Sequence, residues 1–130
     1  MRIEAYFQKA KEVIETCPIV QSSDVRYDKR GTHEGFIRGE LYFLDGSILH
    51  LREYVDVENK IDRLAYAYQY LSSEKQLIFR YDNSGHHKKL NLPTYPNHKH
   101  DGSESNVIAS PSPDLKTILE EIETLVDLPS

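Results

Sequence analysis

Histidines gather late in this chain. Four of its six histidines lie between positions 86 and 100, namely His86, His87, His98 and His100. Histidine exchanges a proton near neutral pH, binds metals and pairs with phosphate. Cationic and acidic side chains accompany them at Arg80, Asp82, Lys88, Lys89 and Lys99. We therefore expect the function of the protein at this cluster, beside the end of an apolar strand.

Acid–base cleavage of RNA is the chemistry that these residue types fit. The reaction needs a group that takes the 2′-hydroxyl proton, an acid for the leaving oxygen and a cation for the phosphorane. One histidine of each pair would move the protons, His86 or His87 with His98 or His100. Arg80 and Lys99 would hold phosphate, and Asp82 would orient a histidine. This scheme uses no metal and no other cofactor.

Two other interpretations stay open for the same residues. In the first, the histidines lie in a solvated loop, and Arg80 and Asp82 form an ion-pair ladder on an exposed sheet face. In the second, the cluster binds a metal ion. The sequence signal for metal is weak, because there is no HExxH or CxxC motif and no two histidines are four residues apart.

Length and composition favour one soluble domain over residues 1–130. A net charge of −5 argues against general coating of nucleic acid, but residues 75–100 carry five Lys or Arg against one Asp. No apolar run is long enough to span a bilayer, and the start does not resemble a signal peptide. The single cysteine, Cys17, fits a reducing compartment. We expect a cytoplasmic protein without membrane contact.

Amphipathic periodicity predicts a helix at each end of the chain. Apolar residues recur at steps of three and four from Ile3 to Cys17, where Pro18 follows, and again from Leu115 to Val126. Ser112 is the predicted N-cap of the second helix. Both helices need an apolar surface to cover.

The middle of the chain predicts strands and hairpins. Asp45-Gly46 indicates a two-residue turn, which would place Leu41 opposite His50 and Arg38 opposite Glu53 as an ion pair. A second hairpin would pair Tyr68 with Phe79 and gather the aromatic residues of both strands on one face. The opposite face would carry Arg80 and Asp82.

The expected fold class is therefore α+β. We expect an antiparallel sheet of about five strands, flanked by an N-terminal and a C-terminal helix. A long His-rich loop over residues 83–110 would precede the last helix, and loops of that length are often functional.

Several motifs together resemble the TumE-type family, small bacterial and archaeal proteins regarded as toxin components of toxin–antitoxin pairs. The resemblance covers about residues 19–104, and Gly85 stands where the family tends to have Pro. The motifs are Gly35-Phe36-Ile37-Arg38-Gly39, Phe43-Leu44-Asp45-Gly46-Ser47, Arg52-Glu53-Tyr54-Val55-Asp56, Tyr66-Ala67-Tyr68-Gln69-Tyr70, Leu77-Ile78-Phe79-Arg80-Tyr81-Asp82-Asn83, His86-His87 and His98-Lys99-His100. Residue by residue, the resemblance marks Arg38, Arg52, Glu53, Tyr54, Arg80, Tyr81, Asp82, His86, His87, His98 and His100.

The resemblance implies a toxin component restrained by a cognate antitoxin. With the histidine cluster, it favours a metal-independent ribonuclease in which Arg38 and Arg52 join the phosphate-binding residues. Two alternatives remain: a non-enzymatic interaction module, and a metal-dependent nuclease or nucleotidyl-transfer enzyme. The oligomeric state is left open, a homo-oligomer included.

Overall fold

The computed structural model describes residues 1–85 and 90–126. Within them, two helices enclose the strands in chain order. The elements are α1 (Ile3–Glu15), β1 (Val20–Lys29), β2 (Glu34–Phe43), β3 (Ile48–Asp56), β4 (Asp62–Leu71), β5 (Leu77–Asp82), β6 (His98–Asp101), β7 (Val107–Ala109) and α2 (Leu115–Glu123). The described residues contain no helix that is both long and apolar enough to cross a membrane.

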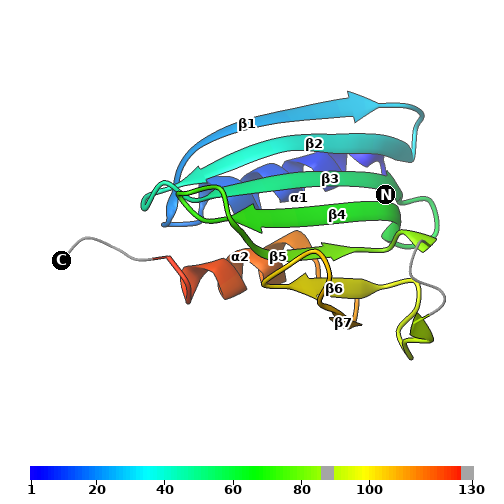
Figure 1. Ribbon diagram of the computed structural model, residues 1–130. Coiled ribbons are helices and arrows are strands. Elements are labelled where there is room, and N and C mark those ends of the chain that lie inside the picture. The colour runs from blue at the N-terminus through cyan, green and yellow to red at the C-terminus, as the bar shows by residue number, and fades with distance from the viewer. Residues whose placement is uncertain (86–89, 127–130) are drawn as a thin grey trace.

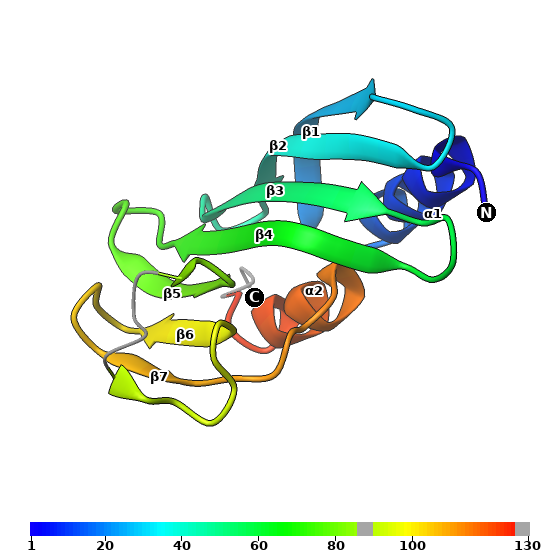
Figure 2. The same ribbon diagram turned by 90° about the vertical axis from the view of Figure 1, so that its right-hand side faces the viewer.

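The strands form one antiparallel sheet in which each strand pairs with the next along the chain (Figure 1). Both helices pack on the same face of this sheet, as Figure 2 shows from the side. The predicted α+β class and the flanking helices are confirmed. No helix of the described residues packs on the other face, and we call it the open face.

The helix-covered face holds the core. Tyr66, Tyr68, Tyr70, Phe79 and Tyr81 are all buried, with ring contacts between Tyr66 and Tyr68 and from Phe79 to both Tyr70 and Tyr81. The predicted aromatic face is therefore confirmed, because side chains two apart in a strand share a face. The apolar stripes of both helices close over these rings.

The first residue of α2 differs from the prediction. Asp114, not Ser112, is the N-cap, and its carboxylate accepts a hydrogen bond of 2.8 Å from the backbone N–H of Thr117. Ser112 instead accepts a hydrogen bond of 2.6 Å at its Oγ from Nη2 of Arg63. Arg63 thereby ties the start of α2 to β4.

The turn between β2 and β3 corrects the predicted register. The N–H of Phe43 donates to the carbonyl of Ser47, so three residues form the loop instead of two, and Gly46 takes a φ of +85°. A three-residue loop with glycine in the left-handed region is a common alternative to the two-residue turn. As a result Arg38 lies opposite Arg52, and Glu53 lies opposite Ile37. The predicted pairs of Arg38 with Glu53 and of Leu41 with His50 were wrong.

The β4–β5 hairpin is also shifted, but by two residues. Tyr68 pairs with Tyr81 and Tyr70 with Phe79, where the prediction had Tyr68 opposite Phe79. Leu71 pairs with Leu77 instead of Gln76, which gives one residue of the shift, and an irregularity between Tyr70 and Leu71 gives the other. A shift of two residues leaves every side chain on its predicted face.

The predicted long loop contains two short strands. β6 pairs with β5 and β7 pairs with β6, which extends the sheet beyond the five strands expected. β6 places His98 and His100 on the open face and Lys99 on the other. The prediction of one loop over residues 83–110 is therefore corrected, because residues 98–109 form a hairpin.

Candidate functional site on the open face

Cross-strand pairing builds a row of side chains across the open face. Arg26 lies opposite Arg38, and Arg38 opposite Arg52. We call Arg26, Arg38 and Arg52 the arginine row. The same line of pairs continues through Ala67 and Asp82 to His98. Along this line, three guanidinium groups are followed by one small side chain, a carboxylate and an imidazole.

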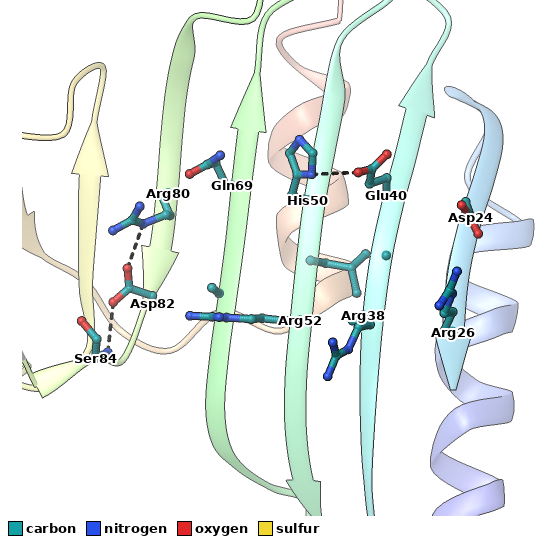
Figure 3. A pocket seen from close by; sticks show the side chains of 13 residues that line it. Asp24, Arg26, Arg38, Glu40, His50, Arg52, Gln69, Arg80, Asp82 and Ser84 are labelled. Carbon is teal, nitrogen blue, oxygen red and sulfur yellow. Dashed lines mark hydrogen bonds and ion pairs between the residues drawn. The ribbon is translucent and has the colours of Figure 1, made fainter. Parts of the chain in front are cut away.

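A second row runs beside the first. It joins Asp24, Glu40, His50, Gln69, Arg80 and His100 through successive strand pairs. Residues of both rows line a hollow of about 540 Å³ on the open face (Figure 3). In that figure the side chain of Arg52 extends from β3 across β4 towards Asp82 and Ser84, which the small side chain of Ala67 allows.

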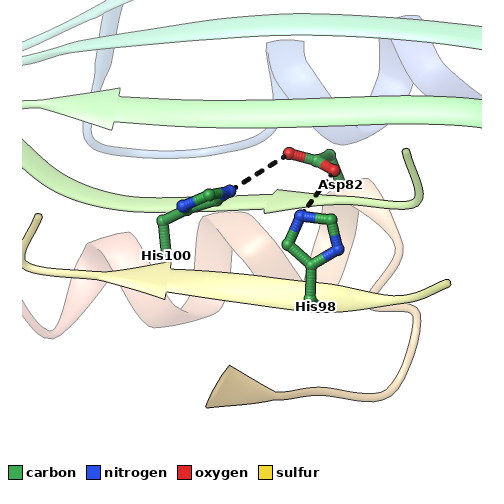
Figure 4. Close-up of side chains that lie close together, drawn as sticks. All are labelled: Asp82, His98 and His100. Carbon is green, nitrogen blue, oxygen red and sulfur yellow. Dashed lines mark ion pairs between the residues drawn. The ribbon is translucent and has the colours of Figure 1, made fainter. Parts of the chain in front are cut away.

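Asp82 lines the hollow, and Figure 4 shows the rings of His98 and His100 on β6 directed at its carboxylate. Nε2 of His98 lies 2.8 Å from its Oδ1, and Nε2 of His100 lies 3.7 Å from its Oδ2. Nε of Arg80 donates to Oδ2 at 3.0 Å, and the N–H of Ser84 donates to Oδ1 at 3.0 Å. Two histidines, an arginine and a backbone amide therefore converge on one carboxylate.

Backbone carbonyls fix the orientation of both imidazoles. Nδ1 of His98 lies 2.9 Å from the carbonyl oxygen of Pro96, and Nδ1 of His100 lies 2.8 Å from that of Glu104. A carbonyl oxygen only accepts, so each Nδ1 carries the donated proton. Nε2 of each ring is consequently the nitrogen that faces Asp82. The side chains of His98 and His100 are only 2 % exposed.

The surroundings of Asp82 favour its charged form. Burial alone would raise the pKa of this carboxyl group. The hydrogen bond from Ser84 and the charges of His98 and Arg80 outweigh burial, so the pKa of Asp82 lies below its ordinary value. Asp82 is thus an anion that accepts hydrogen bonds from Arg80 and from the N–H of Ser84. Arg80, with 29 % of its side chain exposed, connects it to the hollow.

The arginine row and Arg80 differ in whether they are paired with carboxylates. Arg80 bonds to both Asp82 and Glu104. Arg26, Arg38 and Arg52 are exposed, and within residues 1–85 and 90–126 none of them has a carboxylate partner. Their positive charge is therefore available to an anion.

Other residues singled out from the sequence lie on the helix-covered face. Glu53 is buried and accepts hydrogen bonds from the hydroxyl groups of Tyr6 and Tyr68. Tyr81 donates to Glu121 of α2 at 2.5 Å, and Nζ of Lys99 lies 3.3 Å from the same carboxylate. These groups join the sheet to the helices, and the structure places Lys99 on the face opposite to His98 and His100.

Tyr54 lies on the open face but away from Asp82. Its hydroxyl donates to Glu34 at 2.8 Å, and its ring packs on Phe36. Tyr54 and these two neighbours do not line the hollow. His86 and His87 lie outside the described residues.

Sequence reasoning missed Arg26 and the pair of His50 with Glu40, whose side chains lie 3.4 Å apart. Arg26 joins the row only through the β1–β2 register, in which Gly39 faces Val25. A Cβ on Gly39 would lie 2.2 Å from the carbonyl oxygen of Asp24, so this glycine permits the close approach of β1. Gly39 is the sequence signal that could have indicated the pairing.

The tyrosines around Glu53 predict a loss of stability at alkaline pH. Burial, with the charge of Glu53, raises the pKa of Tyr6 and of Tyr68. Folded tyrosines thus retain protons that the unfolded chain releases near pH 10, so this stability is complete below about pH 10 and falls as the pH rises further. Urea unfolding between pH 9 and 11.5 should show Tyr68→Phe reducing the slope by about 1.4 kcal/mol per pH unit. An unchanged slope would contradict the assignment.

Comparison with known proteins completes the description of the site. No curated protein and no solved structure matches the chain. One family model does match: it is described as Toxin TumE, and it covers residues 10–126. The matched region includes the arginine row, Asp82 and both described histidines of the site. Because the match spans most of the chain, the protein belongs to the TumE toxin family.

Proposed function

We propose that the protein is an RNA-cleaving toxin component that binds the RNA backbone on its open face. The arginine row would hold successive phosphates, and cleavage would occur at the end of the row, where Arg80 and Asp82 meet the histidines. The observation that carries the proposal is the continuous line of strand pairs from three arginines to the Asp82–His98 pair.

The electrostatics of the row support a polyanionic ligand. Like charges directly opposite one another in neighbouring strands destabilise a sheet. Arg26, Arg38 and Arg52 are such a set, and no carboxylate among the described residues compensates them. A guanidinium group matches the geometry of a phosphate through two parallel N–H donors. A bound phosphodiester chain would relieve the repulsion.

The chemistry follows from the neighbours of Asp82. Arg80 would stabilise the charge that develops on the phosphorane, because its guanidinium is already fixed by Asp82 at 3.0 Å. His98 and His100 would hold Asp82 and, where the substrate reaches a ring, move a proton. His86 or His87 would supply the second proton-transfer group. Lys99, on the far face, would take no part.

The family assignment adds a partner. A toxin of this kind is restrained by a cognate antitoxin, and the most direct restraint is to cover the face that the RNA needs. An acidic segment of the antitoxin would fit the arginine row by charge complementarity. Antitoxin and RNA would then compete for the same face.

Cleavage of single-stranded and transfer RNA by the purified protein tests the proposal. The wild type should cut RNA, and Asp82→Asn, which keeps the side-chain shape, should lower the rate at least tenfold because Arg80 loses its anionic anchor. Lys99→Ala is the matched control and should cut at the wild-type rate. Replacement of His86 and His87 by alanine tests the second proton-transfer group.

Two results would contradict the proposal. One is a wild-type protein that arrests cell growth but leaves every RNA intact, which would indicate an interaction module. The other is equal cleavage by the wild type and by Asp82→Asn with both proteins folded by circular dichroism.

A further inference from the structure

Asp82, His98 and His100 form a compact group of three buried side chains (Figure 4). One ligand atom from each, a carboxylate oxygen or an imidazole nitrogen, lies within 4.8 Å of the other two. Bonds of about 2.0–2.2 Å from a tetrahedral zinc ion place its ligand atoms about 3.3–3.6 Å apart. The distances from Asp82 to His98 and to His100, 2.8 Å and 3.7 Å, lie close to that range.

The orientation of the imidazoles is the second observation. In metal sites the coordinating histidine nearly always donates its other ring N–H to a carbonyl or carboxylate, which fixes the coordinating nitrogen. His98 and His100 both do so, to Pro96 and Glu104 respectively, and both direct Nε2 towards Asp82. Their spacing of two residues in β6 places both rings on one face of the sheet.

We propose that Asp82, His98 and His100 bind a divalent transition-metal ion of the zinc type through one carboxylate oxygen and the two Nε2 atoms. Three protein ligands leave a further coordination position for water or for an oxygen of a ligand. Asp82 lines the hollow, so that position would face the arginine row. An ion held by both Nε2 atoms would take the place of proton transfer by His98 and His100, and the test of metal binding does not depend on RNA cleavage.

Arg80 gives the proposal a distinctive consequence. Its guanidinium bonds to Oδ2 of Asp82 at 3.0 Å and, through Nη2, to Nε2 of His100 at 3.3 Å. A cation there repels an incoming metal ion and occupies two of its ligand atoms. Removing this charge with Arg80→Gln should therefore tighten metal binding, by about tenfold. A structural network in which Arg80 merely stabilises the group predicts no gain.

Zinc stoichiometry of the purified full chain tests the proposal. The protein is incubated with Zn²⁺, passed through a desalting column and analysed for metal, and X-ray absorption identifies the ligands. The expected result is one zinc ion per chain with two imidazole ligands, tighter binding in Arg80→Gln, and loss of the zinc in the double variant His98→Gln/His100→Gln. The double variant of His86 and His87 to alanine is the matched control and should retain the metal.

Several results would overturn the inference. They are a wild-type protein without zinc, zinc retained by His98→Gln/His100→Gln, zinc lost only when His86 and His87 are replaced, and weaker binding in Arg80→Gln. The double glutamine variant is checked by circular dichroism, because its side chains are buried. Wild-type stoichiometry and the Arg80→Gln affinity decide the question if that variant does not fold.

Discussion

Glu53→Ala should lower the free energy of unfolding by about 3–5 kcal/mol. Glu53 is 2 % exposed, and its carboxylate accepts hydrogen bonds from Tyr6 and from Tyr68, the latter at 2.6 Å. Alanine leaves the buried hydroxyl of Tyr68 and the partly buried hydroxyl of Tyr6 without that acceptor, and it removes the negative charge beside Arg63, which also bonds to Tyr68. Urea denaturation followed by circular dichroism measures the change. Glu53→Gln keeps one acceptor and should cost less.

Glu40→Ala is the matched control for this prediction. Glu40 also accepts a tyrosine hydroxyl, that of Tyr42, and Nδ1 of His50 lies 3.4 Å from its carboxylate. Its side chain is 41 % exposed, so water replaces the lost contacts. The cost should stay below about 1 kcal/mol. Equal losses in the two variants would show that Glu53 is not an anchor between sheet and helices.

The double variant Arg38→Ala/Arg52→Ala should bind single-stranded RNA at least tenfold more weakly near 0.1 M salt. Each arginine that neutralises one phosphate adds about 0.7 to the salt slope of single-strand binding, so the slope should fall by about 1.4. Fluorescence anisotropy at several salt concentrations measures both quantities. Stability should not suffer, because the variant removes two like charges from opposite positions.

Lys99→Ala tests whether RNA affinity depends on where a positive charge lies or only on the net charge. It removes one positive charge, as each arginine substitution does, but Lys99 lies on the helix-covered face beside Glu121. RNA affinity should change less than twofold. An equal loss with Lys99→Ala and with Arg52→Ala would place the RNA elsewhere or indicate nonspecific attraction.

The alternation of side chains along a strand was enough to predict which face of the sheet each residue occupies. Tyr68 and Phe79 were placed on the covered face, and Arg80 and Asp82 on the open one, because strand period survives a register error of two residues. An error of one residue does not preserve faces. At Asp45-Gly46 a two-residue turn would have opposed Leu41 to His50, one residue of each face, whereas the observed three-residue loop opposes Leu41 to Leu49. The apolar pattern of both strands already required that register.

Part of the site could not be read from the sequence. β6 is four residues long, and it alternates histidine with charged residues rather than apolar with polar ones, so no strand signal marked it. Its pairing with β5 brings His98 opposite Asp82 and His100 opposite Arg80. Asp82 lies 2.8 Å from Nε2 of His98, and its role in orienting a histidine stays a prediction. The burial of both imidazoles and their carbonyl contacts depend on this pairing and required the structure.

The face on which RNA lies is the central claim, and a nuclear magnetic resonance titration of the ¹⁵N-labelled protein with a short single-stranded RNA tests it most directly. The account predicts shifts of amide signals along the row, at Arg38, Arg52, Ala67 and Asp82, with α1 and α2 unaffected. Shifts confined to the helices, or none at RNA concentrations that saturate anisotropy, would contradict it.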